Sequence, residues 1–247
     1  MTPGAPCWFE LATSDRDVAR HFYATLFGWS AFETQPDYTV FQLEGKSVAA
    51  AYPAAPGERV RWNIYFSVEN VDAAAATVDS LGGKVTKGPF AVGEYGRMAI
   101  VTDPQGAEFV LWQPGTLPGV ERMHTPNAVL WVELATRGIA QVAEFYQALL
   151  GWSTKPHPGA PGTYEIFSTG GQDWGGLLEM DAEWGDKPSF WSFYVWSTDV
   201  DANIEQAQAL EGRIFAPPFD APGVGRLAML SDPTGARFSL LTPSPAA

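Results

Sequence analysis

Two glutamates stand at the same place in two copies of a short sequence, and their side chains are well suited to acid–base chemistry. Residues 8–13 read WFELAT and residues 131–136 read WVELAT, so Glu10 corresponds to Glu133. Side chains two residues apart in a strand share a face, which places each glutamate beside the tryptophan that opens its segment. A carboxylate that loses solvation among aromatic groups has a raised pKa and can act as a general base.

The same glutamates also have a purely structural interpretation. Each carboxylate could pair with an arginine or accept a hydrogen bond from a tyrosine. Arg97 and Arg226 recur at equivalent places of the two copies. Strand alternation puts these arginines on the face opposite to Met98 and Leu227, so we interpret them as structural or rim residues.

Histidine and cysteine offer little for catalysis here. His21, His124 and His157 have no counterparts in the other copy, and we interpret them as solvent or interface residues rather than metal ligands. The single cysteine, Cys7, cannot form an internal disulfide and has no paired histidine, so we expect an inert thiol.

Composition excludes several classes of partner. The formal net charge is −13 and no basic patch occurs, which argues against binding to nucleic acid and to an anionic membrane. The N-terminus lacks the pattern of a signal peptide, and no apolar stretch has membrane-spanning length. With 46% hydrophobic residues and ten tryptophans, each half can bury its own core. We expect a globular, cytoplasmic protein, and its oligomeric state stays open.

The repeat covers nearly the whole chain. Gly28-Trp29 returns as Gly151-Trp152, and Asp103-Pro104 returns as Asp232-Pro233. A repeat of this length predicts two duplicated domains rather than a solenoid. Residues 114–126 are rich in proline and glycine and lack apolar periodicity, which is typical of a linker. We therefore predict domains at 1–113 and 127–247 with the linker 114–126 between them.

The first helix illustrates how the strands and helices are expected to follow one another. Ser14 is suited to cap its N-terminus, and Gly28 is suited to end it. Val18, Phe22 and Leu26 are spaced four residues apart, so they should share one buried face.

Strands and one further helix should complete the first half. Strands are expected at 8–13, around 38–43 and 47–52, and at 62–68, followed by a helix over about 72–81. The second half begins with an equivalent strand at 129–136. The pattern predicts four β-α-β-β-β units, two in each half.

Three segments resemble a known family: the strand WFELAT, the helix end FYATLFGW and the late DPQGAEFVLWQP. They are similar to the vicinal oxygen chelate superfamily, which groups glyoxalase I, extradiol dioxygenases, and fosfomycin and bleomycin resistance proteins. The resemblance implies an α+β fold of two tandem glyoxalase-like domains, each an open, curved mixed sheet of two paired β-α-β-β-β units around a cavity. Such motifs indicate fold more strongly than function.

The resemblance also implies a divalent metal, held by His or Glu at three strand positions. In this sequence the positions carry other residues in both halves: Trp8 and Trp131 in the first strand, Asn63 and Ser192 in the fifth, Val110 and Ser239 in the last. We therefore expect no metal and no other cofactor. An alternative stays open, because Glu10 and Glu133 lie two residues past the lost ligand and could hold a metal by carboxylates.

The resemblance and strand alternation together indicate which side chains face each cavity. In the first domain these are Trp8, Glu10, Asn63, Tyr65, Met98, Ile100, Val110 and Trp112; in the second they are Trp131, Glu133, Ser192, Tyr194, Leu227, Met229, Ser239 and Leu241. An apolar, aromatic lining with a few polar groups suits a flat or aromatic small molecule. The alternative is that these side chains simply fill a core.

Three hypotheses of function follow. The first is a metal-independent protein that binds a hydrophobic, ring-containing metabolite or antibiotic-like molecule. The second is a metal-free isomerase, cyclase or oxygenase acting on an aromatic or polyketide-like substrate, in which Glu10 or Glu133 moves a proton. The third is a divalent-metal lyase or dioxygenase with unconventional ligands.

Overall fold

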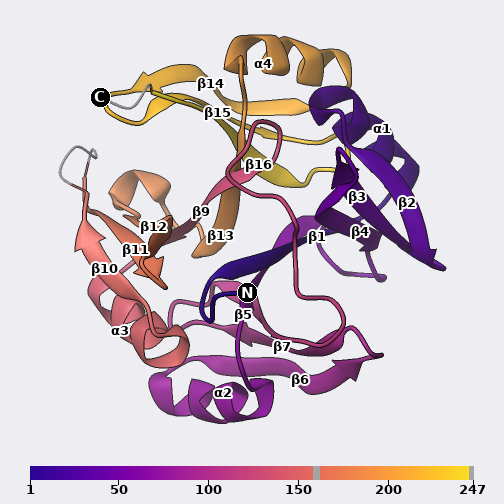
Figure 1. Cartoon of the computed structure of the whole chain (residues 1–247). Coiled ribbons are helices and arrows are strands. Elements are labelled where there is room, and N and C mark those ends of the chain that lie inside the picture. The colour runs from indigo at the N-terminus through magenta and orange to yellow at the C-terminus, as the bar shows by residue number, and fades with distance from the viewer. Residues whose placement is uncertain (158–161, 245–247) are drawn as a thin grey trace. The chain divides into compact units, whose positions relative to one another are not determined.

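The computed structural model describes residues 1–157 and 162–244 and contains two eight-stranded mixed sheets, one from each copy of the repeat. The first sheet has the strand order β2-β3-β4-β1-β5-β8-β7-β6, and the second has the equivalent order β10-β11-β12-β9-β13-β16-β15-β14. Both are open sheets, and four α-helices accompany them in the described residues (Figure 1). The predicted α+β class is confirmed, with one open mixed sheet formed by each copy of the repeat.

The first copy contains eight strands and two α-helices, the second of which ends in a 3-10 turn at Asp79–Leu81. Their bounds are β1 Pro6–Thr13, α1 Arg16–Phe27, β2 Ser30–Gln35, β3 Tyr38–Leu43, β4 Lys46–Pro53, β5 Arg61–Ser67, α2 Val71–Val78, β6 Lys84–Val92, β7 Gly96–Thr102 and β8 Glu108–Pro114.

The second copy repeats this order, with a 3-10 turn at Ala182–Trp184. Its bounds are β9 Val129–Thr136, α3 Ile139–Leu150, β10 Ser153–Pro156, β11 Tyr164–Thr169, β12 Gln172–Glu179, β13 Phe190–Trp196, α4 Val200–Ala209, β14 Arg213–Ala221, β15 Gly225–Ser231 and β16 Arg237–Pro243. No helix or strand lies between β8 and β9.

The chain packs into two compact units, and each unit takes one β-α-β-β-β motif from each copy of the repeat. Unit 1 comprises residues 1–8, 63–119 and 132–191; unit 2 comprises residues 9–62, 120–131 and 192–247. Accordingly α2 packs near α3 in unit 1, and α1 packs near α4 in unit 2.

Helix α1 differs from its predicted form at two places. Its N-cap is Asp15 rather than Ser14, because the Asp15 carboxylate accepts hydrogen bonds from the backbone N–H groups of residues 17 and 18, both at 3.0 Å. Val18 is 38% exposed, whereas Phe22 and Leu26 are buried. The buried stripe also contains residues 19, 23 and 27, so its centre lies away from Val18. The helix ends as predicted at Gly28, which has φ 70°.

A buried Asp–Tyr–Trp cluster joins the two copies within each unit. In unit 1, Oδ1 of Asp103, in the turn between β7 and β8, accepts from the N–H groups of Gln105 and Ala107, both at 2.9 Å. Tyr146 of α3 donates its hydroxyl to Asp103 Oδ2 at 3.2 Å and accepts from Trp191 Nε1 at 2.9 Å. The turn of one copy is thereby anchored to the helix of the other.

Unit 2 has the equivalent cluster. Tyr23 of α1 donates to Asp232 Oδ2 at 3.2 Å and accepts from Trp62 Nε1 at 3.0 Å. Burial raises the pKa of both tyrosines well above the usual range. These tyrosines are therefore neutral hydrogen-bonding groups of the core.

The aspartates of these clusters give a prediction on pH. Burial raises the pKa of Asp103 and of Asp232, against the opposing effect of the hydrogen bonds that they accept. A carboxyl group with a raised folded-state pKa contributes stability that is present below its unfolded pKa, about 3.9, and is lost as pH rises through the folded pKa. The Asp103→Asn variant cannot titrate, so we expect it to be more destabilised relative to the wild type near pH 4 than near pH 7. Urea unfolding of both proteins at the two pH values measures this. An equal difference in the free energy of unfolding between wild type and variant at both pH values would contradict the prediction.

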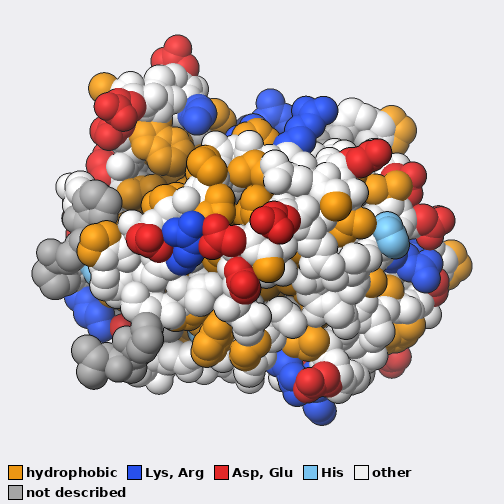
Figure 2. All heavy atoms as spheres, turned by 90° about the horizontal axis from the view of Figure 1, so that it is seen from above, with side chains coloured by type: hydrophobic (Ala, Val, Ile, Leu, Met, Phe, Trp, Pro, Cys, Tyr) orange, Lys and Arg blue, Asp and Glu red, His pale blue; other side chains and the backbone are white. Residues whose placement is uncertain are grey.

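Charged side chains of both signs are scattered among uncharged ones on the face that Figure 2 shows. Figure 2 shows acidic side chains spread over one face with basic side chains among them. Within the described residues, no helix combines the length and the hydropathy needed to span a membrane.

Candidate functional site

Each of the two repeated glutamates accepts a hydrogen bond from a tyrosine of its own compact unit. In unit 2, Tyr38 at the start of β3 donates its hydroxyl to Glu10 Oε1 at 2.7 Å. Glu10 lies on β1 opposite Ala50 of the parallel strand β4. In unit 1, Tyr164 at the start of β11 donates to Glu133 Oε2 at 3.0 Å.

The Glu133 pair is built around a glycine. Glu133 on β9 lies opposite Gly176 of the parallel strand β12. A Cβ atom added to Gly176 would overlap the hydroxyl oxygen and Cζ of Tyr164. The hydroxyl end of the phenol therefore occupies the place that a side chain at residue 176 would fill. Only 8% of Glu133 is exposed. The rings of His157 and Tyr164 meet edge to face, with centroids 6.0 Å apart at 83°.

The sequence left open whether these glutamates have arginine or tyrosine partners, and the structure places a tyrosine at each. Arg97 instead bonds Asp72 at 2.8 Å, and Arg226 bonds Asp201, also at 2.8 Å. Both ion pairs are exposed, as expected for structural or rim residues.

Sequence reasoning missed Tyr38 and Tyr164. A usable signal was present, because both tyrosines open equivalent strands of the two copies, in the segments YTVF and YEIF. The role of Gly176 had no such signal, since the first copy has Ala50 at that place.

Five of the residues predicted for the first cavity form a continuous surface within unit 1. Across β5, β8 and β7, Tyr65 lies opposite Val110, which lies opposite Ile100; in the next row Trp112 lies opposite Met98. The rings of Tyr65 and Trp112 meet edge to face, with centroids 6.1 Å apart.

The remaining residues of that set are distributed as follows. Trp8 is buried and Asn63 is half-buried, both in unit 1, whereas Glu10 belongs to unit 2. Met98 and Ile100 are half-buried, while Tyr65, Val110 and Trp112 are buried. The surface is therefore apolar and aromatic, and Met98 and Ile100 are its more accessible members.

In unit 2 the equivalent surface is also apolar, and part of it forms a hydrophobic cluster. Tyr194 lies opposite Ser239, which lies opposite Met229. Tyr194, Leu227 and Leu241 form a hydrophobic cluster against which Trp131 and three other apolar residues pack. Ser192 and Met229 are half-buried beside it, and Glu133 belongs to unit 1. The packing of Tyr194, Leu227 and Leu241 therefore fits the alternative interpretation, in which these side chains simply fill a core.

The residues do not fit the divalent metal that the fold resemblance implies. Among residues 1–157 and 162–244, no group of three His, Cys, Asp or Glu side chains could hold a metal ion. The expected ligand positions carry Trp8, Asn63 and Val110 in one copy and Trp131, Ser192 and Ser239 in the other. These side chains offer a metal neither imidazole nor carboxylate.

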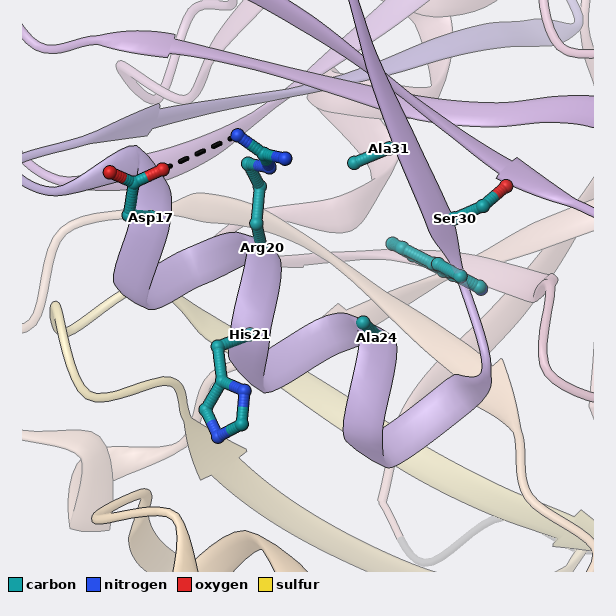
Figure 3. A pocket seen from close by; sticks show the side chains of 7 residues that line it. Asp17, Arg20, His21, Ala24, Ser30 and Ala31 are labelled. Carbon is teal, nitrogen blue, oxygen red and sulfur yellow. Dashed lines mark hydrogen bonds and ion pairs between the residues drawn. The ribbon is translucent and has the colours of Figure 1, made fainter.

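The other reactive groups are placed away from these pairs or are unreactive. Burial lowers the pKa of His124 and raises the pKa of the Cys7 thiol, so both are neutral at pH 7. His21 lies exposed on α1, at a shallow surface pocket of about 390 Å³ lined also by Arg20 and Ser30 (Figure 3). Arg20 forms an ion pair with Asp17 there at 3.3 Å.

Comparison with known proteins agrees with the fold. A family model described as Glyoxalase/Bleomycin resistance protein/Dioxygenase superfamily matches residues 7–111, and one described as Glyoxalase-like domain matches residues 131–241. The chain is 36% identical over 253 residues to "Putative glyoxylase CFP32" of Mycobacterium tuberculosis, covering 98% of this chain and 96% of that protein. It is 34% identical over 260 residues to "Anthracycline biosynthesis protein DnrV" of Streptomyces peucetius, covering 98% and 94%.

Solved structures are similar in fold at low identity. The Mn(II)-bound glyoxalase from Novosphingobium aromaticivorans has a TM-score of 0.66 at 16% identity, covering 99% of this chain and 89% of that one. The 2,3-dioxygenase LapB from Pseudomonas sp. KL28 has a TM-score of 0.67 at 16% identity, covering 99% and 94%.

Proposed function

Because the chain belongs to the glyoxalase/bleomycin resistance protein/dioxygenase superfamily, we propose that it uses this fold to bind a hydrophobic, ring-containing small molecule without a divalent metal. The observation that carries the proposal is the apolar surface of unit 1. There, Tyr65, Val110 and Ile100 form one row across three strands, and Trp112 and Met98 form the next.

This surface has the chemistry that a flat aromatic ligand requires. Tyr65 and Trp112 supply ring faces and edges, with which another ring can stack or meet edge to face. Met98 is an unbranched, polarizable side chain that adapts to a ligand's outline, and with Ile100 it is half-buried.

A relative supports the choice of an antibiotic-like ligand. DnrV is named for anthracycline biosynthesis, and it aligns with nearly the whole of this chain. Anthracyclines are fused-ring aromatic compounds, and such a ring system has the flat, apolar faces that the unit 1 surface would contact.

The proposal predicts binding of planar aromatic compounds to chelator-treated protein. Titration with a panel that includes 2-naphthol should quench intrinsic tryptophan fluorescence with a dissociation constant of about micromolar or lower. A Met98→Ala, Ile100→Ala double variant should bind about tenfold more weakly, because it removes apolar contact area. The matched control is Arg97→Ala, because Arg97 directly precedes Met98 and lies on the other strand face.

Two results would contradict the proposal. One is the absence of quenching by every member of the panel. The other is stoichiometric divalent metal in protein purified without a His tag, combined with binding that chelator abolishes and metal restores. The second result would favour the metalloenzyme hypothesis with unconventional ligands.

A second candidate function is a metal-free enzyme that moves a proton on such a ring. The observation that favours it is the recurrence of one Glu–Tyr pair in both copies, Glu10 with Tyr38 and Glu133 with Tyr164. A carboxylate oriented by a tyrosine hydroxyl is a suitable general base when a substrate proton lies within hydrogen-bond distance.

A further inference from the structure

We infer that a hydroxyl-bearing aromatic ring binds over Gly176, where it displaces the phenol of Tyr164 and donates its own hydroxyl hydrogen to Glu133. The inference rests on the proposed function and specifies its ligand class. The Tyr164 side chain then occupies the site when no ligand is bound, because its phenol is itself a hydroxyl-bearing aromatic ring.

Gly176 leaves a slot above β12, which the Tyr164 phenol fills. Any side chain at residue 176 would overlap the Tyr164 phenol, because an added Cβ already overlaps its hydroxyl oxygen and Cζ. The hydroxyl end of one aromatic ring therefore occupies the space above Gly176. Another flat ring with a hydroxyl group matches that space, whereas a bulky aliphatic group does not.

The floor of this slot is supported from the opposite face of β12. The preceding residue, Gly175, points the other way, and an added Cβ there would overlap the ring of Phe167. Phe167 is fully buried and stacks on Trp152, with ring centroids 3.8 Å apart at 12°. Because the interior below is close-packed, β12 holds its position when the ring above it changes.

The groups around the slot suit a hydroxyl-bearing aromatic ring. The Glu133 carboxylate accepts from a phenolic hydroxyl at 3.0 Å, so it is placed for a donor on the edge of a flat ring. The His157 ring and that phenol meet edge to face, an arrangement that another aromatic ring could take over. Tyr164 is half-buried, so its side chain has a route to solvent.

The other copy lacks this slot. Ala50 stands at the place of Gly176, and its methyl group lies on the strand that faces Glu10. Tyr38 still reaches Glu10 at 2.7 Å, but the Ala50 methyl group takes up the space that Gly176 leaves to the phenol in the other copy. The two copies are therefore not equivalent, and the hydroxyl-specific site belongs to unit 1.

The test uses the full-length, chelator-treated protein and two matched probes, 2-naphthol and 2-methoxynaphthalene, which lacks the hydrogen-bond donor. The Tyr164→Ala variant should bind 2-naphthol about tenfold more tightly than the wild type, because the ligand no longer competes with the internal phenol. Binding of 2-methoxynaphthalene should change much less. Adding Gly176→Ala to that variant should abolish the gain, because the methyl group fills the slot.

Two control variants separate the slot from general effects. Tyr164→Phe keeps a ring over Gly176 and should show a smaller gain than Tyr164→Ala. Tyr52→Ala removes a different Tyr–Glu pair, in which Tyr52 donates to Glu58 at 2.6 Å, and should leave the affinity for 2-naphthol unchanged. Thermal unfolding of each variant reports whether it is folded.

The outcomes distinguish this inference from the proposed function. If the wild type binds 2-naphthol but folded Tyr164→Ala shows no gain, or gains equally for both probes, the inference is overturned and the proposed function stands. If neither probe nor any other ring compound binds the wild type or the variants, both are overturned.

Discussion

Replacing Trp152 by alanine is expected to lower the free energy of unfolding by about 3 to 5 kcal/mol. Trp152 is 2% exposed and stacks on Phe167 and Tyr146, with ring centroids at 3.8 and 4.5 Å. Its Nε1 donates to the backbone oxygen of Gly4 at 2.7 Å. Truncation would leave a cavity between packed rings, because the surrounding side chains relax only partly. It would also leave the backbone oxygen of Gly4 without its donor.

Urea unfolding followed by far-ultraviolet circular dichroism measures this loss. The matched control is Trp184→Ala, since Trp184 is half-buried and contacts the Phe190 ring at 6.2 Å and the Lys187 ammonium at 5.2 Å. We expect the control to lose about 1 kcal/mol or less. Equal losses in the two variants would show that Trp152 has no special part in the core of unit 1.

The second large effect concerns catalysis. If the protein is a metal-free enzyme, Glu133→Gln or Glu10→Gln should lower kcat by about 10²- to 10⁴-fold, because the amide cannot accept the substrate proton. The amide oxygen can still accept the hydroxyl of Tyr164 or Tyr38, so binding should change by no more than a few fold. Single-turnover kinetics and fluorescence titration, with an aromatic compound that the wild type converts, separate the two effects.

The two single variants and the double variant together decide between the candidate functions. Loss of turnover in one single variant, with binding retained, identifies which copy carries the base. Unchanged turnover in the double Glu10→Gln, Glu133→Gln variant would exclude both glutamates from proton transfer. A wild type that binds aromatic compounds and converts none of them would favour the binding protein.

Much of the fold followed from local sequence signals. The strands at 38–43 and 129–136 were predicted with the bounds that the structure shows, because apolar alternation and flanking turns are local. The helix end at Gly28 was also predicted, since only glycine readily adopts its positive φ. The N-cap and the buried stripe of α1 were shifted, because neighbouring elements decide which of several adjacent residues is buried or capped.

The candidate site was predictable only in part. Strand alternation and the repeat predicted that Tyr65, Val110 and Ile100 share a face, and their pairing across three strands confirms this. Their function as a ligand surface stays a proposal. The tyrosine partners of the glutamates were not predicted, because they come from strands 28 and 31 residues away, and sheet register decides such contacts.

The sequence by itself determined the duplication, the type of the main elements and the alternation of side chains along the strands, because all of these depend on residue type and short-range period. Only the tertiary structure decided how the motifs combine. It joined Tyr146 to Asp103, 43 residues away, and Tyr23 to Asp232, 209 residues away. It also placed Tyr164 over Gly176 and against Glu133. Contacts between segments so distant in sequence are selected by sheet register and by the close packing of buried side chains, and neither leaves a local pattern in the chain.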